Sequence, residues 1–160
     1  MPVPSLYRQE KVDTCALACL RMILAFLGTD VAEMELEDRA VMESGGIEIS
    51  NLQTLAWNYG LQAEIHQLDI EAITGLIASG VYPLVYLNRL HLDRRHSTSR
   101  IIALRESIVH AVIPIRVSQK FVTFMDPLPP GRKRRVSRRR FTAAQRDLAQ
   151  WCLVCRRGSR

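Results

Sequence analysis

The apolar residues between positions 15 and 27 recur every three to four positions, which is the spacing of one face of an α-helix. That face contains Leu17, Leu20, Ile23, Leu24 and Leu27. Gly28 is typical of the residue just past a helix end, and Asp13 or Thr14 is placed to cap the start. The pattern predicts an amphipathic helix that begins at Cys15.

Weaker patterns of the same kind predict further helices, and alternating or short apolar runs predict strands. The helices are expected at 31–43, at 50–59 with Ser50 as cap and Gly60 as stop, after Asp69 as cap to near Gly80, and at 141–150. The strands are expected at 61–68, 82–87, 107–117, 120–126 and 151–155.

Strands 107–117 and 120–126 are separated by a short turn at Ser118 and Gln119, which predicts a β-hairpin. Residues 88–106 are polar and charged, and they are expected to form a surface loop. Because helices come first and strands follow, the order predicts an α+β fold with an antiparallel sheet rather than alternating βαβ units.

Composition limits the class of protein. The chain has 160 residues, 48% of them hydrophobic, so residues 1–160 are expected to form a single domain with its own core. No apolar run approaches the roughly eighteen residues of a membrane span, and no signal peptide begins the chain. A cytoplasmic location is therefore expected, in which the four cysteines stay reduced as thiols.

The charge is unevenly distributed. The net charge is +6. From Arg132 onward the chain has eleven Lys or Arg residues and one acid, Asp147, a charge of +10, which leaves −4 for the rest of the chain. The densest part is the basic segment 131–140, GRKRRVSRRR. Its arginines, Arg132 to Arg140, could bind nucleic acid, anionic lipid or an acidic partner, but a solvated basic loop is the favoured interpretation.

Cys15 has the position of a reactive thiol. The free amides and the dipole at the start of a helix stabilise a thiolate. A thiolate nucleophile also needs a base and a group that orients the base. His110 and Asp126 supply this pair, because a turn at 118–119 places them nearly opposite each other on the two hairpin strands.

Gln9 lies six residues before Cys15. A side-chain amide in this place can donate to a developing oxyanion together with the backbone N–H of Cys15. The four residues therefore form a candidate catalytic set of nucleophile (Cys15), general base (His110), orienting acid (Asp126) and oxyanion donor (Gln9). This chemistry needs no cofactor and no metal.

These motifs resemble the bacteriocin-processing cysteine peptidases, which cleave leader peptides at a double-glycine site. The resemblance rests on Gln9, on Cys15 opening CALACL, and on HAVIPI and FVTFMDP around His110 and Asp126; GGIEISNLQTLAWNYGLQAEI is also similar. It implies a papain-like fold, the four residue roles given above, a leader-peptide substrate and an export transporter encoded separately. Thr14 and Ala16 stand where the family usually has an acid and a glycine.

Other functions remain open. The same fold could bind leader peptides without cutting them, transfer an acyl group to an acceptor other than water, or act as an adaptor for nucleic acid or an anionic surface through the arginine run. Cys19 is expected to pack in the core. Cys152 and Cys155 are expected on opposite faces of a strand, which argues against a redox pair.

Three further interpretations concern metal ligands and aromatic residues. A zinc site built from all four cysteines, Cys15, Cys19, Cys152 and Cys155, is less favoured because the first pair has poor spacing for a zinc knuckle. His91 and His96 are expected in a solvated loop, and Trp57 and Trp151 in the core.

Overall fold

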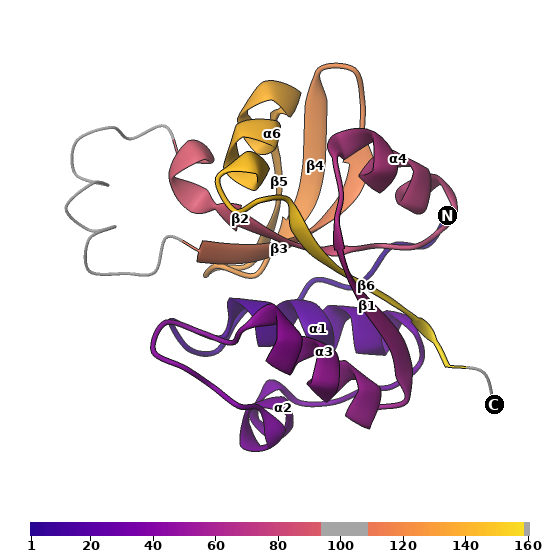
Figure 1. Ribbon diagram of the computed structural model, residues 1–160, viewed down its shortest axis with the longest axis vertical. Coiled ribbons are helices and arrows are strands. Elements are labelled where there is room, and N and C mark those ends of the chain that lie inside the picture. The colour runs from indigo at the N-terminus through magenta and orange to yellow at the C-terminus, as the bar shows by residue number, and fades with distance from the viewer. Residues whose placement is uncertain (94–108, 159–160) are drawn as a thin grey trace.

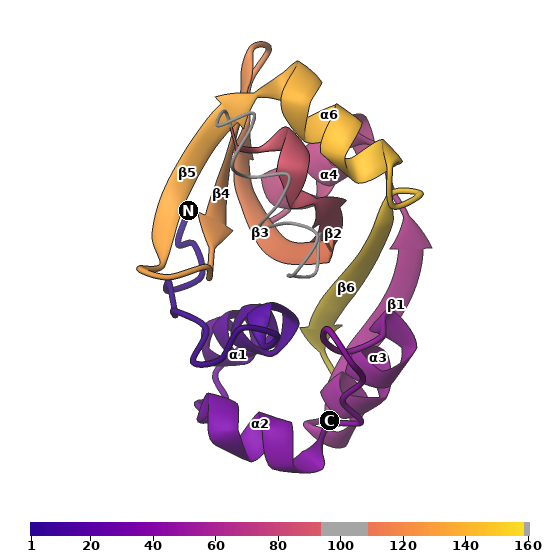
Figure 2. The ribbon, with the colours of Figure 1, turned by 90° about the vertical axis from the view of Figure 1, so that its left-hand side faces the viewer.

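The structure, a computed structural model, describes residues 1–93 and 109–158. At its centre is a six-stranded sheet with antiparallel pairing throughout and the order β1-β6-β2-β3-β4-β5, which Figure 2 shows as a strongly curved surface. The strands are β1 (Leu61–Gln67), β2 (Leu84–Asn88), β3 (Val109–Val117), β4 (Phe121–Asp126), β5 (Arg132–Ser137) and β6 (Trp151–Arg157). The predicted α+β class is confirmed.

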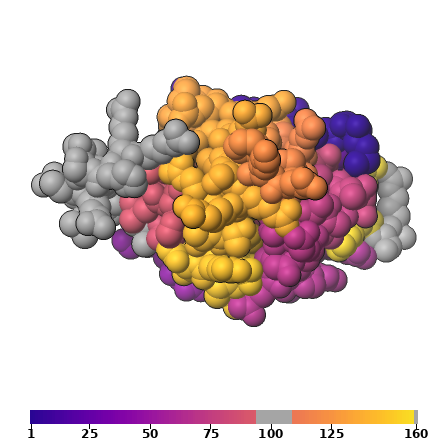
Figure 3. All heavy atoms as spheres, turned by 90° about the horizontal axis from the view of Figure 1, so that it is seen from above, coloured from indigo at the N-terminus to yellow at the C-terminus, as the bar shows by residue number. Residues whose placement is uncertain are grey.

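Helices cover both faces of the sheet (Figure 1). On one side lie α1 (Cys15–Phe26), α2 (Glu33–Arg39) and α3 (Ile49–Asn58); on the other lie α4 (Ile70–Ala78) and α6 (Arg138–Arg146). Figure 3 views the molecule from the second side, on which the segments that contain α4 and α6 form part of the surface. No helix of the described residues is long and apolar enough to cross a bilayer.

Each face of the sheet has its own hydrophobic core. Strand β3 contributes to both, because successive side chains point to opposite faces: Ala111 and Ile113 pack toward α1, and Val112 packs toward α4 and α6. The spacing of apolar residues in α1 explains its place in the first core, in which Leu17, Leu20 and Leu24 are fully buried.

The helix ends agree only partly with the predictions. Gly28 follows α1 with a φ of 99°, a conformation that suits glycine, and Asp69 caps α4 by accepting the backbone N–H of Ala72 at 2.8 Å. The predicted side-chain cap of α1 is wrong, because Thr14 occupies the N-cap position without a capping hydrogen bond. Ser50 is likewise not a cap, since α3 begins one residue earlier, at Ile49.

The basic segment 131–140 is not a loop, which corrects the favoured interpretation of the sequence. Arg132–Ser137 forms β5, the edge strand paired with β4, and Arg138 already begins α6, which was expected at 141. Ser137 caps α6 by accepting the backbone N–H of Arg140 at 3.3 Å. The first part of the basic segment 131–140 therefore belongs to the sheet, and its last three residues belong to the helix.

Three smaller expectations also change. The second helix, α2, covers Glu33–Arg39 instead of the whole of 31–43. Trp57 and Trp151 are exposed rather than core residues, and Trp57 donates from Nε1 to the Ala63 carbonyl at 3.0 Å. Of the expected 88–106 loop, the described part continues β2 to Asn88, forms the short helix η1 (Arg89–His91) and ends at Asp93. The remainder, including His96, lies outside the described residues.

Candidate active site

The N-terminus of α1 places Cys15 against the start of β3. The Thr14 hydroxyl accepts the Lys11 N–H at 3.0 Å and donates to the Lys11 carbonyl at 3.1 Å, so it stabilises the preceding loop instead of capping α1. The first-turn amides keep no side-chain cap. Backbone hydrogen bonds from Ala16 and Ala111 reach the Cys15 sulfur and favour the thiolate.

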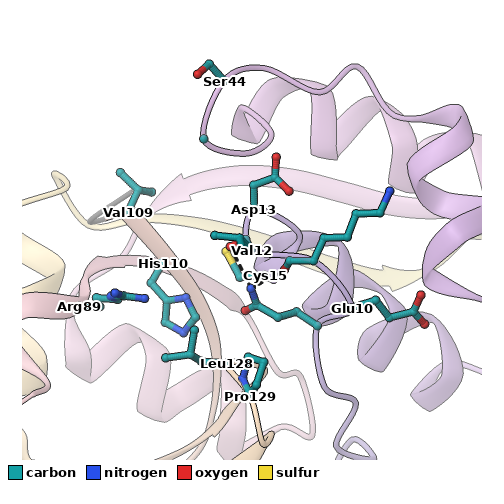
Figure 4. Close-up of a pocket in the computed structure, with 13 residues that line it drawn as sticks. Glu10, Val12, Asp13, Cys15, Ser44, Arg89, Val109, His110, Leu128 and Pro129 are labelled. Carbon is teal, nitrogen blue, oxygen red and sulfur yellow. Dashed lines mark hydrogen bonds between the residues drawn. The ribbon is translucent and has the colours of Figure 1, made fainter. Parts of the chain in front are cut away.

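Cys15 and His110 form a coupled pair, and Figure 4 shows both in the same pocket. Burial alone raises the pKa of Cys15, but the hydrogen bond with His110 and the charge of that ring lower it below the ordinary value. Burial lowers the pKa of His110, whereas its hydrogen bonds with Asp126 and Cys15 raise it to about 9. The site therefore favours a thiolate beside an imidazolium at neutral pH.

Asp126 holds the other side of the imidazole ring. His110 Nε2 lies 2.7 Å from Asp126 Oδ1, and both residues are buried. This bond leaves Nδ1 as the ring nitrogen for the Cys15 thiol. The predicted pairing of the two residues is thus present as a hydrogen bond.

The register that produces this contact differs from the expected one. Met125 pairs with Ile113, so Asp126 continues to the level of Val112, two residues from His110. The pairing register shifts between Pro114 and Arg116, which lie closer to the hairpin turn than His110 and Asp126 do. His110 and Asp126 are therefore diagonal neighbours on one face rather than opposite each other, which still allows a hydrogen bond.

Arg134, which the sequence pattern did not single out, completes the surroundings of Asp126. Arg134 Nη1 donates to Asp126 Oδ2 at 2.9 Å, and the Leu128 N–H donates to Oδ1 at 3.0 Å. Burial alone would raise the pKa of Asp126, but these donors and His110 hold it below its ordinary value. Arg134 went unnoticed because it lies in a run of similar residues; only the alternation Arg132, Arg134, Val136 indicates an inward-facing arginine.

Gln9 also lines the pocket, but its side-chain amide is hydrogen-bonded to the loop that contains it. It is buried, and its Nε2 donates to the carbonyls of Lys11 at 2.7 Å and Val12 at 3.0 Å. Its backbone N–H donates to the Pro127 carbonyl at 2.9 Å, which ties the loop before α1 to the end of β4. The structure places Gln9 with Cys15 and His110, and its role as an oxyanion donor stays a prediction.

The pocket has a volume of about 910 Å³ and lies between the loop before α1 and the first residues of β3. Its walls come from residues 9–13, 44–45, 109 and 128–129 and from Arg89. A second, more apolar hollow of about 510 Å³ adjoins it, shares Ser44, Gly45 and Val109, and is lined by Ile47, Tyr86 and Trp151 among others. The two hollows therefore share part of their walls beside Cys15 and His110.

The remaining cysteines differ chemically from Cys15. Cys19 is fully buried in the first core, and burial raises the pKa of its thiol. Cys152 and Cys155 pack in different cores, as expected from their spacing, and burial raises the pKa of each to about 12. All four cysteines are free, and the described residues contain no cluster of three or more potential metal ligands.

A helix-borne cysteine facing a curved antiparallel sheet that carries a histidine and an aspartate defines the papain-like class of cysteine peptidases, which are hydrolases. The model of the Peptidase C39 family matches residues 5–145, and the chain belongs to this family. A search of curated proteins gives no match.

Solved structures show the same fold. A C39-like peptidase from Bacillus anthracis is 18% identical with a TM-score of 0.75, over 98% of this chain and 96% of that one. A double glycine motif protease from an AMS/PCAT transporter, solved in complex with its leader peptide, is 18% identical with a TM-score of 0.69, over 96% and 91%. The peptidase domain of Streptococcus ComA, a bifunctional ABC transporter of quorum sensing, is 14% identical with a TM-score of 0.72, over 95% and 97%.

Proposed function

We propose that this peptidase cleaves peptide bonds through a triad of Cys15, His110 and Asp126. The observation that carries the proposal is the chain of hydrogen bonds from the half-buried Cys15 thiol through the buried His110 to the buried Asp126, which lowers the pKa of one cysteine while burial raises the pKa of the other three. A lowered thiol pKa beside an imidazolium is the property that a thiolate nucleophile requires.

The geometry supports a two-step hydrolysis. The Cys15 thiolate attacks the scissile carbonyl carbon, and the His110 imidazolium gives its proton to the departing amine, which leaves a thioester on Cys15. Neutral His110 then takes a proton from water, whose oxygen attacks the thioester; the acid product departs and the thiolate–imidazolium pair is restored. Asp126 holds the ring in place throughout and stabilises its charged form.

The oxyanion of each tetrahedral intermediate needs donors on the other side of Cys15. The backbone N–H of Cys15 at the uncapped start of α1 is one. Gln9 supplies the second when one Nε2 hydrogen leaves the Val12 carbonyl, the longer of its two hydrogen bonds. Such a shift upon substrate binding agrees with the tendency of catalytic hydrogen bonds to improve in the complex.

The proposed substrate is a leader peptide cut after a double-glycine-type site, and the proposed partner is a peptide-export transporter. Support comes from the family and from two similar structures, one a double glycine motif protease bound to its leader peptide and one the peptidase domain of an ABC transporter. The adjoining hollows beside Cys15 offer room for an extended chain. We place the reaction in the cytoplasm, where a catalytic thiol stays reduced.

The alternatives have less support. A domain that only binds leaders has no use for a thiol whose pKa is lowered by a hydrogen-bonded histidine. Acyl transfer would use the same thioester with another acceptor in place of water. None of the comparisons supports a nucleic-acid partner for the arginine run.

The test is selective alkylation followed by cleavage. The protein is treated with limiting iodoacetamide at about pH 6, below the ordinary thiol pKa, and the labelled cysteine is mapped for the wild type and for His110→Ala. We expect Cys15 to react far faster than the other three cysteines, and His110→Ala to abolish that advantage. Leader peptides carrying Gly-Gly or Leu-Leu before the cleavage site are then compared, with Cys15→Ala as the inactive control.

Equal labelling of Cys15 and Cys19 would rule out the thiolate–imidazolium pair and with it the proposed mechanism. Fast labelling of Cys15 without cleavage of either peptide would retain the nucleophile and reject the leader-peptide substrate.

A further inference from the structure

Arg134 is a largely buried arginine on a strand whose other arginines are exposed. The Arg134 side chain is only 14% exposed, whereas Arg132 and Arg135 on the same strand are exposed to solvent. Its guanidinium donates from Nη1 to Asp126 Oδ2 at 2.9 Å and from Nη2 to Asp93 Oδ1 at 3.0 Å. The same Nη2 also donates to a backbone carbonyl, that of residue 92, at 3.1 Å. Three acceptors from two segments therefore fix the plane of the group.

This contact determines how the Asp126 carboxylate is oriented. Oδ1 is shared by His110 Nε2 at 2.7 Å and the Leu128 N–H at 3.0 Å, and Oδ2 receives Arg134. The Asp126 side chain is only 2% exposed, so water cannot replace a lost donor freely. Without Arg134, a buried charged oxygen would lack its partner, and the carboxylate could rotate away from His110.

We propose that Arg134 is a positioning residue of the active site: it keeps Asp126 Oδ1 directed at His110 and supplies the positive charge that maintains the Cys15–His110 ion pair. This inference rests on the proposed function, since it concerns the same triad. Arg134 acts through Asp126, and its planar fork is suited to hold Asp126 and Asp93 at once.

The charges of the site alternate in sign from the thiolate of Cys15 to the carboxylate of Asp93. Removing the Arg134 cation disfavours the neighbouring anions, so the pKa of Cys15 rises, and loss of an aligned Asp126 carboxylate, which weakens the imidazolium beside Cys15, shifts the pKa of Cys15 in the same direction. Other cations lie near: Arg132 pairs in register with Asp126 but is exposed and screened, Arg89 lies at the pocket wall, and Lys133, Arg135 and Arg140 line the same hollow as Arg134 and Asp93. Arg132 is therefore a matched control of equal charge.

The experiment measures the rate of Cys15 alkylation by iodoacetamide against pH in the wild type, Arg134→Gln, Arg134→Lys and Arg132→Gln. The acid limb is the pH range over which the Cys15 alkylation rate rises as the thiol ionises. For Arg134→Gln we expect this limb to move to higher pH by roughly half a unit or more, which is the direction that loss of a cation requires. Arg132→Gln should keep the wild-type limb. Arg134→Lys should also keep it, because the charge remains, but should lower kcat for peptide cleavage with little change in KM, because an ammonium cannot hold two carboxylates in the same geometry.

A purely structural role would lower the melting temperature of Arg134→Gln and leave the acid limb where it is, and that result would overturn the proposal. So would a shift of equal size in Arg132→Gln. If Arg134→Gln does not fold, Arg134→Lys decides: a wild-type kcat rejects the positioning role. Absence of fast Cys15 labelling in the wild type would instead count against the proposed function itself.

Discussion

Cys19 Sγ lies 3.4 Å from the carbonyl oxygen of Ala111 and donates to it, one helical turn after Cys15. The backbone of the same Ala111 forms a hydrogen bond with the Cys15 sulfur, and His110 directly precedes it in β3. Both cysteines of α1 therefore form hydrogen bonds with the backbone of one residue of β3, Ala111. This contact between helix and strand holds Cys15 beside His110.

Cys19→Ala is expected to weaken this contact without removing the reactive thiol. Loss of a buried thiol from a packed site removes about one methylene equivalent and leaves a small cavity, so the free energy of unfolding should fall by about 1–2 kcal/mol. Urea unfolding measures the change, and Cys155→Ala, another buried cysteine of the same core, is the control. Equal alkylation kinetics of Cys15 in Cys19→Ala and the wild type would show that Cys19 serves packing; a large loss would give it a part in the chemistry.

The pH dependence of cleavage should be bell-shaped. The proposed mechanism requires the Cys15 thiolate, whose pKa is lowered by His110, and protonated His110, whose pKa is raised to about 9. The rate should therefore rise well below the ordinary thiol pKa, stay high through neutral pH and fall as the pH passes about 9. Measurement of kcat/KM against pH tests this, and an alkaline limb near the ordinary histidine pKa would contradict the raised value.

The sequence predicted which residues meet at the candidate site better than it predicted the residues that support them. Cys15 at a helix start and His110 and Asp126 on a hairpin are local features, which periodicity and turn position reveal. The diagonal register of His110 and Asp126 was missed because the hairpin turn closes one residue later than expected, with Val117 paired with Val122, and the pairing shift between Pro114 and Arg116 recovers only part of that offset. The assignment of residues 1–160 to one domain stays a prediction, and the family match covers 5–145.

Strand β5 was missed for a different reason. RKRRVS has one β-branched residue and five polar or charged ones, so its intrinsic preference gives no strand signal. Pairing with β4 overrides that preference, and basic side chains on an edge strand also hinder unwanted pairing with another sheet. The inward position of Arg134 follows from this pairing, which is a tertiary property.

Glu33 should make stability depend on pH. It is 1% exposed at the start of α2, its Oε1 accepts the Glu10 N–H at 2.8 Å, and its Oε2 has no hydrogen-bond partner among the described residues. Burial raises its pKa above the ordinary 4.5, although the hydrogen bond from the Glu10 N–H opposes this shift. A raised acid pKa means that this group favours the folded state at low pH and that its contribution is lost as the pH rises through the folded-state value.

Glu33→Gln removes that titration and keeps an oxygen for Glu10. The difference in melting temperature, variant minus wild type, should increase from about pH 4 to pH 7, because only the wild type must bury a charge at the higher pH. Glu35→Gln changes an exposed acid of the same helix and is the control for loss of a charge alone. A difference that stays constant with pH would mean that Glu33 is not strained by burial.

Gln9→Ala separates binding of the oxyanion from support of the loop before α1. Loss of an oxyanion donor should lower kcat for peptide cleavage by about 10²-fold. Alkylation of Cys15 by iodoacetamide forms no tetrahedral oxyanion at a carbonyl, so its rate should change little if the loop stays in place. If Gln9 serves only to hold the carbonyls of Lys11 and Val12, cleavage and alkylation should fall together, since both need Cys15 in its place. Parallel measurement of the two rates, with the melting temperature as a check on folding, therefore decides whether the amide of Gln9 acts on the substrate or on its own loop.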